Sequence, residues 1–481
     1  MTPSSLRRVK ILATLGPASQ DEAMLTKMVH AGMNAVRCNF SHGTPEDHGK
    51  RVDLIRTIMA KTGKTIAILG DLQGPKIRVA KFKEGKILLN DGDTFFLDSS
   101  LGRDEGDQTQ VGIDYKELPK DVKPGDILLL DDGKIIFEVI STNGVRVHCI
   151  VTAGGVLSNN KGINKEGGGL TAPALTEKDM EDIKTAAKLG MDYVAVSFVR
   201  SASDIEYARQ LLKEAGSNAG IVAKIERVEA VENLDEIIQA SDVAMVARGD
   251  LAVEVGDAQV PSIQKRIIQR CRELDKIAIT ATQMMESMIE CPTPTRAEVS
   301  DVANAVLDGT DVVMLSAETA SGKYPVKTIE AMDRVIRAVE LDPVTFTSKH
   351  RVELKFDRID ESIAMATMYT ANHIHAKAIV ALTESGATTL WMSRIRSRLP
   401  IYALTKNTAT MGRVMLYRGV FPIHFDSSKL SIDQVNRAAI QELTKRDLAK
   451  DGDLVILTSG DQVGVHGGTN KMQILTVGQV V

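Results

Sequence analysis

A lysine and two carboxylates follow two short apolar runs, and their spacing suits the transfer of a phosphoryl group. Lys224 and Glu226 follow the apolar run 221–223, and Asp250 follows the run 243–247. Runs of this length bounded by polar residues are typical of buried strands, on which residues i and i+2 face the same way. Two neighbouring parallel strands would therefore bring one cation and two carboxylates to a single point. Carboxylates can hold a hard divalent ion and the lysine can meet anionic oxygens, which are the requirements of phosphoryl transfer.

The elements around these residues alternate between strand-like and helix-like patterns. The first three apolar runs are separated by the helical patterns 21–31 and 45–62, and the same rhythm resumes near Leu175. This alternation is typical of a parallel sheet, and eight such strands in succession predict a closed (β/α)8, or TIM, barrel. The strand-like runs are residues 9–15, 35–40, 65–71, 193–198, 220–225, 243–247, 278–281 and 311–315.

Two further regions interrupt or follow the barrel pattern. Residues 73–168 offer short alternating runs punctuated by turn pairs such as Asp91-Gly92, which predicts an all-β domain inserted after the third barrel strand. A domain inserted there could act as a lid over the barrel's open end. After about residue 341, a helical pattern and further strand-like runs predict an open α/β domain. The predicted domains of this α/β protein are 1–72 with 169–340, 73–168, and 341–481.

Composition and charge limit the classes of function. The 481 residues are 43% apolar and 25% charged, with a net charge of −4, a balance that argues against a general nucleic-acid binder. No run approaches the roughly 18 apolar residues of a membrane span, so no membrane partner is expected. The four scattered cysteines predict buried, reduced thiols, and we expect a cytoplasmic location.

Polar residues end most of the predicted barrel strands, where barrel enzymes carry their active sites. Taken singly they have ordinary explanations: a lysine–glutamate pair is usually a surface pair, a glycine–aspartate pair is usually a turn, and Asn39 with Ser41 could cap the next helix. Core packing does not explain polar residues at the ends of at least seven strands, so the joint pattern favours a site. These residues include Arg37, Asn39, Ser41, Asp71, Ser197, Lys224, Glu226, Arg248, Asp250, Thr282 and Ser316.

Longer stretches around these residues resemble the pyruvate kinase family. The likeness extends over nearly the whole chain, and it implies phosphoryl transfer from phosphoenolpyruvate to ADP, which yields pyruvate and ATP. It also implies a homotetramer and dependence on Mg²⁺, for which Mn²⁺ could substitute. The stretches that carry the resemblance are VRCNFSHG (36–43), GDLQGPKIR (70–78), VAKIE (222–226), ARGDL (247–251), TATQMMESM (280–288), TRAE (295–298) and DVANAV (301–306).

The resemblance implies roles for individual residues. Glu226 and Asp250 hold the Mg²⁺, and Lys224 stabilises the phosphoryl group during transfer. Arg37 contacts the substrate phosphate, while Thr282 matches the position that delivers a proton to enolpyruvate, through water because a threonine hydroxyl is too weak an acid. Lys224, Thr282 and Arg37 form the catalytic set. The substrate-binding set is Arg37, Lys224, Gly249, Asp250, Thr282 and Ser316, and the nucleotide-binding set is Asn39, Arg78 and Lys161.

The region that binds K⁺ in many pyruvate kinases departs here from their pattern. Asn39, Ser41 and Asp71 match ligand positions, but Leu72 stands where Thr or Ser is usual. Lys76 stands where Glu is common, and its ammonium group could supply the positive charge that K⁺ otherwise brings. The chain therefore resembles the K⁺-independent bacterial branch, and we expect little or no K⁺ requirement.

The last region resembles the family's effector-binding domain. Residues 383–388 join a strand to a helix and offer hydroxyls and backbone N–H groups for one phosphate, although a plain helix cap would have the same pattern. The loop 460–470 has no Arg or Lys for a second phosphate, so we expect a sugar monophosphate or AMP rather than fructose 1,6-bisphosphate. The predicted effector residues are Thr383, Glu384, Ser385, Gly386, Ala387 and Thr388.

Two other functions compete with this interpretation. A Mg²⁺-dependent aldolase or mutase with the same barrel is disfavoured by Lys224, Thr282 and the inserted domain. A catalytically silent sugar-phosphate sensor would be expected to lack Lys224 or one metal carboxylate, and the sequence keeps all of them. Pyruvate formation from phosphoenolpyruvate, measured with and without ADP, separates the three.

Overall fold

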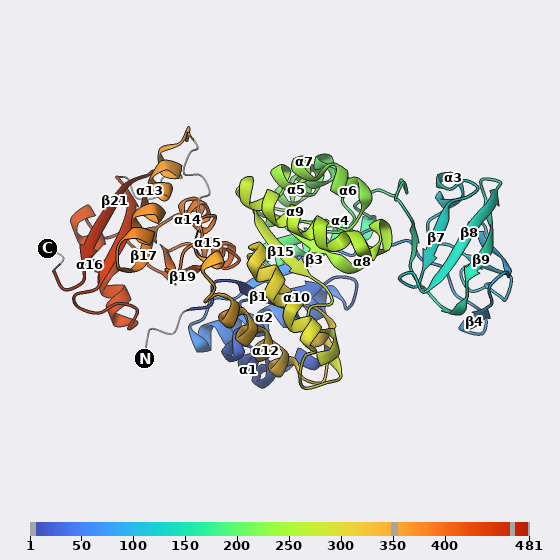
Figure 1. Ribbon diagram of the computed structural model, residues 1–481, viewed down its shortest axis with the longest axis horizontal. Helices are drawn as coiled ribbons and strands as arrows, with labels where there is room; N and C mark the ends of the chain where they lie inside the picture. Colours follow the sequence, from blue (N-terminus) through green and yellow to red (C-terminus); the bar gives the residue numbers. More distant parts are fainter. Residues whose placement is uncertain (1–5, 348–354, 462–466, 480–481) are drawn as a thin grey trace. The chain divides into compact units, whose positions relative to one another are not determined.

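The computed structural model describes residues 6–347, 355–461 and 467–479, and its central feature is a closed barrel of eight parallel strands (Figure 1). Nearly every strand residue is buried, as expected for a parallel sheet covered on both faces. The predicted (β/α)8 fold is confirmed, and two strands have the predicted bounds. In barrel order the strands are β1 (Lys10–Thr14), β16 (Val312–Leu315), β15 (Ile277–Ala281), β14 (Val243–Ala247), β13 (Gly220–Ile225), β12 (Tyr193–Val196), β3 (Ala67–Asp71) and β2 (Ala35–Asn39).

Capping residues set where several barrel helices begin. The Asp21 carboxylate accepts the N–H of Met24 at the start of α1 (Glu22–Ala31). Thr44 and Asp47 form a reciprocal capping box at the start of α2 (Pro45–Thr62). The other helices of the barrel region are α4 (Glu177–Lys188), α5 (Ala202–Glu214), α6 (Val228–Glu232), α7 (Leu234–Ala240), α8 (Arg248–Val255), α9 (Val260–Glu273), α10 (Arg296–Asp308), α11 (Ala317–Ala320) and α12 (Pro325–Val339).

The segment inserted after β3 is built from short strands, as predicted. Phe95 and Phe137 pack in its core with their ring centroids 5.5 Å apart. A six-stranded sheet has the order β11-β7-β8-β9-β5-β6, and β10 pairs with β4 in a separate two-stranded sheet. The strands are β4 (Lys86–Leu89), β5 (Thr94–Asp98), β6 (Gln110–Gly112), β7 (Ile127–Leu130), β8 (Ile135–Thr142), β9 (Arg146–Ala153), β10 (Gly155–Ser158) and β11 (Ile163–Lys165).

The C-terminal part of the chain is an open five-stranded sheet with helices, again as predicted. Its order is β19-β18-β17-β20-β21, and β21 runs antiparallel to β20. The strands are β17 (Ala376–Leu382), β18 (Ile401–Thr405), β19 (Val420–His424), β20 (Leu454–Gly460) and β21 (Thr469–Thr476), and the helices are α13 (Ile359–His373), α14 (Ala387–Ser393), α15 (Thr408–Val414) and α16 (Ile432–Lys445).

Internal contacts divide the chain into two compact units. The first unit comprises Met1–Gly70, Lys188–Val194 and Ile268–Val481, and it contains the C-terminal sheet. The second unit comprises Asp71–Ala187 and Ala195–Ile267, and it contains the inserted sheets with strands β13 and β14. Each unit carries part of the predicted site.

Candidate active site

Lys224 is the centre of a charged cluster in the second unit. Its side chain is only 12% exposed, and its ammonium nitrogen lies 2.9 Å from Glu226 Oε1 and 3.5 Å from Asp71 Oδ1. The same nitrogen donates a hydrogen bond of 2.7 Å to Ser197 Oγ. Strand geometry explains the first contact, because residues 224 and 226 leave β13 on one face.

Glu226 is almost wholly buried, at 1% exposure. Its Oε2 accepts the backbone N–H of Phe198 at 2.8 Å. Burial raises the pKa of Glu226 above its usual value; Lys224 lowers this pKa, whereas the neighbouring carboxylate of Asp250 raises it. Glu226 and Asp250 are therefore close enough for their negative charges to repel each other. A further cation between them would stabilise both carboxylates.

Asp250 stands in the first turn of α8 and already faces a cation. Lys76 Nζ lies 3.2 Å from Asp250 Oδ1 and 3.9 Å from Asp132 Oδ1. The chain segment that follows β3 therefore reaches the carboxylate predicted to hold metal, which spacing in the sequence did not indicate.

The donor set fits a hard divalent cation. Glu226 and Asp250 offer carboxylate oxygens, the ligands that Mg²⁺ prefers. Within the described ranges no cluster of three or more His, Cys, Asp or Glu side chains with metal-binding geometry occurs. These two carboxylates would therefore need substrate oxygens and water to complete a coordination sphere, which is how Mg²⁺ is commonly bound at phosphoryl-transfer sites.

Strained backbone marks the ends of two barrel strands. Thr282, directly after β15, has φ of 65°, and Gln283 has φ of 53°. Phe198, two residues beyond β12, has φ of 56°. Left-handed backbone is rare for β-branched and bulky residues, and such strain clusters at functional sites. Thr282 Oγ1 donates a hydrogen bond of 2.7 Å to the carbonyl of Ala281, so the hydroxyl is held beside the strand end.

Of the other predicted substrate residues, Gly249 belongs to α8 in the second unit, whereas Arg37 and Ser316 lie in the first unit. Arg37 Nη1 donates to Thr14 Oγ1 at 3.2 Å, and the backbone N–H of Ser316 donates to Glu318 Oε2 at 2.6 Å. Asn39 Oδ1 accepts the N–H of Ser41 at 3.1 Å. Because Thr44 caps α2, the alternative in which Asn39 and Ser41 cap the next helix is wrong.

Arg78 and Lys161, the two nucleotide candidates of the insertion, belong to adjacent segments of the second unit. The N–H of Val79 donates to the carbonyl of Lys161 at 2.9 Å, and Arg78 Nη1 donates to the carbonyl of Asn160 at 3.0 Å. The Lys161 ammonium lies 2.7 Å from Asp131 Oδ1. Both cations are partly exposed, so solvent-borne phosphate oxygens can reach them.

Ser197, one of the polar residues at the predicted strand ends, contacts Lys224 directly, and its position in the sequence did not indicate this partner. Its hydroxyl accepts from Lys224 and donates to the carbonyl of Leu72 at 2.8 Å, so it ties the lysine to the backbone after β3. Its place just beyond a barrel strand was the available signal, but a serine there has many uses.

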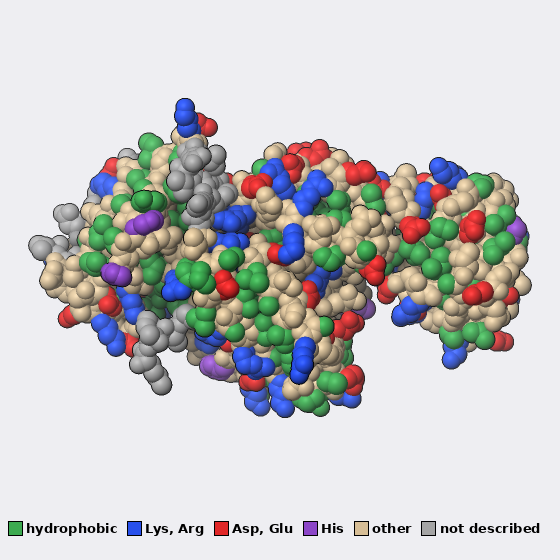
Figure 2. Space-filling view, in the orientation of Figure 1, with side chains coloured by type: hydrophobic (Ala, Val, Ile, Leu, Met, Phe, Trp, Pro, Cys, Tyr) green, Lys and Arg blue, Asp and Glu red, His purple; other side chains and the backbone are tan. Residues whose placement is uncertain are grey.

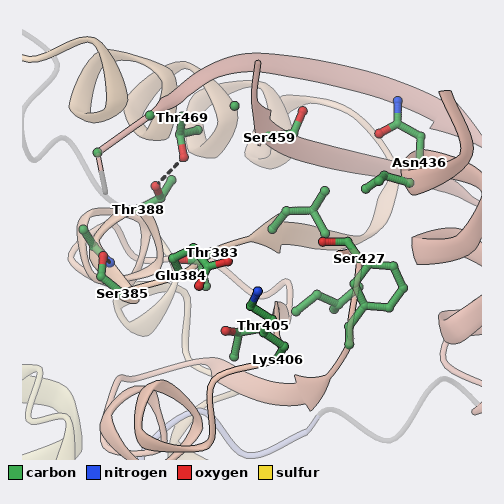
Figure 3. Close-up of a pocket in the computed structure, with 18 residues that line it drawn as sticks. Thr383, Glu384, Ser385, Thr388, Thr405, Lys406, Ser427, Asn436, Ser459 and Thr469 are labelled. Atoms are coloured by element: carbon green, nitrogen blue, oxygen red, sulfur yellow. Dashed lines mark hydrogen bonds between the residues drawn. The ribbon is translucent and has the colours of Figure 1, made fainter. Parts of the chain in front are cut away.

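A second pocket, in the C-terminal sheet, collects the predicted effector loop (Figure 3). About 810 Å³ of space, part of it open to solvent, is free of protein atoms between the ends of β17, β18 and β20. Thr383, Glu384, Ser385, Ala387 and Thr388 line it, whereas Gly386 is the left-handed cap of α14, with φ of 86°. Thr388 and Thr469 share a hydrogen bond of 2.8 Å between their hydroxyls.

Lys406 also lines this pocket, a role that its place in the sequence did not indicate. It directly follows β18, at the same end of the sheet as the effector loop. Part of the loop 460–470, namely 462–466, lies outside the described residues, while Gly460 and Gly467 to Thr469 line the pocket.

The cysteines and the surface agree in part with the expectations from composition. Cys38, Cys149 and Cys271 are buried, but Cys291 is exposed, so the prediction of burial is wrong there. Basic and acidic side chains are interspersed on the face that Figure 2 draws. No helix in the described ranges has the length and apolar character needed to cross a membrane.

The closed parallel barrel, with charged side chains at the carboxyl ends of its strands, defines a (β/α)8-barrel enzyme. Residues 6–329 match the family model described as the pyruvate kinase barrel domain, and 361–475 match the pyruvate kinase alpha/beta domain. The chain is 57% identical over 476 residues to "Pyruvate kinase II" of Salmonella typhimurium, with 98% of this chain and 99% of the relative covered. It is 57% identical over 477 residues to a pyruvate kinase of Haemophilus influenzae, with the same coverage, and 42% identical over 478 residues to one of Corynebacterium glutamicum, with 98% of each chain covered.

The chain therefore belongs to the pyruvate kinase family. It is a phosphotransferase, which forms pyruvate from phosphoenolpyruvate with ADP as acceptor. Membership also implies a requirement for a divalent metal.

Proposed function

We propose that this enzyme transfers the phosphoryl group with Lys224 as the stabilising cation and with Mg²⁺ held by Glu226 and Asp250. The observation that carries the proposal is the largely buried ammonium group of Lys224, 2.9 Å from Glu226 and 3.5 Å from Asp71. A preorganised cation in a place with little water acts strongly on charge that moves during the reaction. The lysine is held by three oxygen partners, so it needs little reorganisation to meet a phosphoryl group.

Glu226 and Asp250 would supply two oxygen ligands to the metal. When bound, Mg²⁺ would polarise a phosphoryl oxygen and offset the repulsion between the two anionic substrates. Mn²⁺, which accepts the same oxygen ligands, would substitute. The present partners of these carboxylates, Lys224 and Lys76, support a need for positive charge at this place.

Arg37 would bind the substrate phosphate, and the backbone N–H groups of Gly249 and Asp250 would bind the substrate carboxylate. Ser316 would be a further substrate contact. After transfer, the enolpyruvate carbon must gain a proton. Thr282 would position the water chain that delivers it, since its hydroxyl is held at a strained strand end. Asn39, Arg78 and Lys161 would bind the nucleotide, with Lys161 exchanging Asp131 for a phosphate oxygen.

A monovalent cation would be dispensable in this enzyme. Asn39, Ser41 and Asp71 retain oxygen groups, but Leu72 is an apolar side chain, 1% exposed, at the next ligand position. The Lys76 ammonium, 3.2 Å from Asp250, supports the idea that lysine supplies the charge instead of K⁺.

The direct test is pyruvate formation from phosphoenolpyruvate. We expect turnover that requires both ADP and Mg²⁺, stops on chelation by EDTA and returns with excess Mg²⁺ or Mn²⁺. Equal turnover without ADP would mean that water accepts the phosphoryl group, which would contradict the proposed kinase reaction, and no turnover under any of these conditions would point to the silent sensor.

We further propose that the pocket at residues 383–388 binds a sugar monophosphate or AMP that activates the enzyme. Hydroxyls of Thr383, Ser385 and Thr388 and the ammonium of Lys406 suit a phosphate, while Glu384 suits sugar hydroxyls. Figure 3 shows these side chains grouped around one space.

Replacing Lys406 by glutamine is expected to weaken activation by the effector about 10- to 100-fold, because a charge-assisted hydrogen bond contributes roughly 1.5–3 kcal/mol. Turnover without effector should stay unchanged. The measurement is activity at subsaturating phosphoenolpyruvate during titration with ribose 5-phosphate, AMP or fructose 1,6-bisphosphate. Lys450→Gln, at an exposed position outside the pocket lining, is the matched control. An unchanged titration curve for Lys406→Gln would contradict the assignment.

We propose three domains, 1–72 with 169–340, 73–168 and 341–481, supported by the separate sheets of these regions. Independent unfolding of an isolated 73–168 fragment would support that boundary.

A homotetramer, suggested by the family, is to be tested by sedimentation equilibrium. A cytoplasmic location is supported by the scattered and mostly buried cysteines, and it is tested by cell fractionation.

A further inference from the structure

A cavity lined by arginines lies in the first unit, away from the loop 383–388. Its walls come from the segment before β1, from α9, from the turn between α10 and β16, and from the C-terminal sheet. About 430 Å³ of space beside these walls, part of it open to solvent, holds no protein atoms. The cavity and the effector pocket have no lining residue in common. The charged lining residues are Arg8, Arg272, Arg394, Arg396, Arg418 and Asp311.

Neighbouring groups hold several of these guanidinium groups in place. Arg8 donates at 2.6 Å to the carbonyls of Glu340 and Ser397. Arg394 forms a buried ion pair with Asp311, with Nη1 at 3.0 Å from Oδ2. Such fixed guanidinium forks line the cavity without losing side-chain entropy when a ligand binds.

Arg418 differs from its neighbours. It is only 8% exposed, yet its Nη2 has no hydrogen-bond partner within the described ranges. Burial lowers the pKa of Arg418 to about 10; Arg8 and Arg394 act in the same direction, against Glu340 and Asp311. The side chain therefore stays charged near neutral pH and keeps a buried donor that no described group satisfies. A buried charge with unmet hydrogen-bonding capacity is costly for a fold to keep.

Positive charge exceeds negative charge around the cavity. Five guanidinium groups face the carboxylates of Asp311 and Glu340. Adding Asp275 and Asp308, which act on Arg394 and Arg396, gives four carboxylates against five cations. Arg396 contributes a second unused donor, because its buried Nε also has no partner within the described part of the chain.

We propose that this cavity binds a small oxoanion, of the phosphate or sulfate class, through Arg418 and Arg396. Guanidinium groups match the geometry of such oxygens and present several donors at once. None of the lining residues that the structure describes carries an aromatic ring, so the cavity offers no stacking surface for a nucleobase. The anion would neutralise the excess charge and stabilise the junction of segments that are more than a hundred residues apart in sequence, such as Arg8 and Arg418.

The site is tested by measuring the midpoint temperature of thermal unfolding of the full chain. Sodium chloride in the buffer is replaced by sodium phosphate or sulfate at constant ionic strength. The wild-type midpoint should rise with the oxoanion, because a ligand that binds the folded state shifts the equilibrium. Arg418→Met should show a smaller rise, with a midpoint in chloride that is equal to or above that of the wild type. Arg437→Met, at an exposed position of α16, should behave as the wild type does.

Equal rises in wild type and Arg418→Met would overturn the proposal, since phosphate would then act elsewhere. The same unfolding scans are repeated with glycerol 3-phosphate in place of inorganic phosphate. If glycerol 3-phosphate raises the midpoint at the lower concentration, the natural ligand is a phosphate ester; if inorganic phosphate does so, the natural ligand is the free ion. If Arg418→Met does not fold, crystals of the wild type soaked in selenate decide the matter. An anomalous peak within hydrogen-bonding reach of Arg418 is expected, and an empty cavity would overturn the site.

Discussion

Replacing Lys224 by methionine is expected to lower kcat for pyruvate formation by about 10³–10⁵-fold, the range for a cation that stabilises charge on a transferring phosphoryl group. Methionine keeps much of the length of the side chain but removes the ammonium that lies 2.9 Å from Glu226. The loss should fall mainly on kcat, because the lysine is proposed to act on charge in the transition state. A coupled assay of pyruvate production measures it.

The variant should remain folded, although its charge balance changes. Without Lys224, the largest opposing influence on the pKa of Glu226 disappears, and burial should raise that pKa further, so Glu226 takes up a proton more readily. Circular dichroism and thermal unfolding check the fold. Lys184→Met, which removes an exposed lysine paired with Glu181 at 2.6 Å, is the control for loss of a lysine. A Lys224→Met enzyme that keeps more than about a tenth of wild-type kcat would exclude the proposed role.

Replacing Lys76 by glutamate is expected to create a requirement for K⁺. Without K⁺, activity should fall about 10- to 100-fold, because a carboxylate replaces the ammonium 3.2 Å from Asp250 and adds repulsion at the metal site. Addition of K⁺ at constant ionic strength should restore much of the loss. The wild-type enzyme should change little when Na⁺ is exchanged for K⁺.

Lys76→Met separates loss of the ammonium from gain of an oxygen ligand. Like the glutamate variant, Lys76→Met lacks the positive charge, but it offers no carboxylate to hold K⁺. Its activity should therefore be low, and added K⁺ should not restore it. Several-fold activation of the wild type by K⁺ would refute the proposed substitution by lysine, as would equal rescue of both variants.

Local pattern predicted the barrel well because each of its elements carries its own signal. β13 and β14 have the predicted bounds, since an apolar run bounded by charged residues specifies a buried strand without reference to distant parts. Strands β6 and β11, inside the insertion, have only three residues each, which is too short for an alternating pattern to be recognised. Their strand geometry depends on the neighbours with which they pair.

In the candidate site, too, local pattern predicted some features, whereas others depend on contacts between distant parts of the chain. Alternation along one strand is enough to place Lys224 and Glu226 on one face, and the next apolar run places Asp250 at a neighbouring strand end. The resemblance to the family supplied the role of Thr282. The contact of Lys76 with Asp250 joins positions 174 residues apart, and no periodicity encodes such a distance. Lys406 was missed for a similar reason, because a single lysine after a strand gains meaning only when the loop 383–388 lies beside it.

Sequence alone thus determined the strands, the family and the residue types of the catalytic groups, because these depend on order and spacing along the chain. Tertiary structure alone decided which charges meet and which stay unmatched. Ser197 holds Lys224 only because the chain folds two strand ends together. Arg418 is an ordinary arginine in the sequence, and it becomes a buried cation with an unused donor only when distant segments close around it. Burial and charge pairing are properties of the packed chain, and a linear pattern does not contain them.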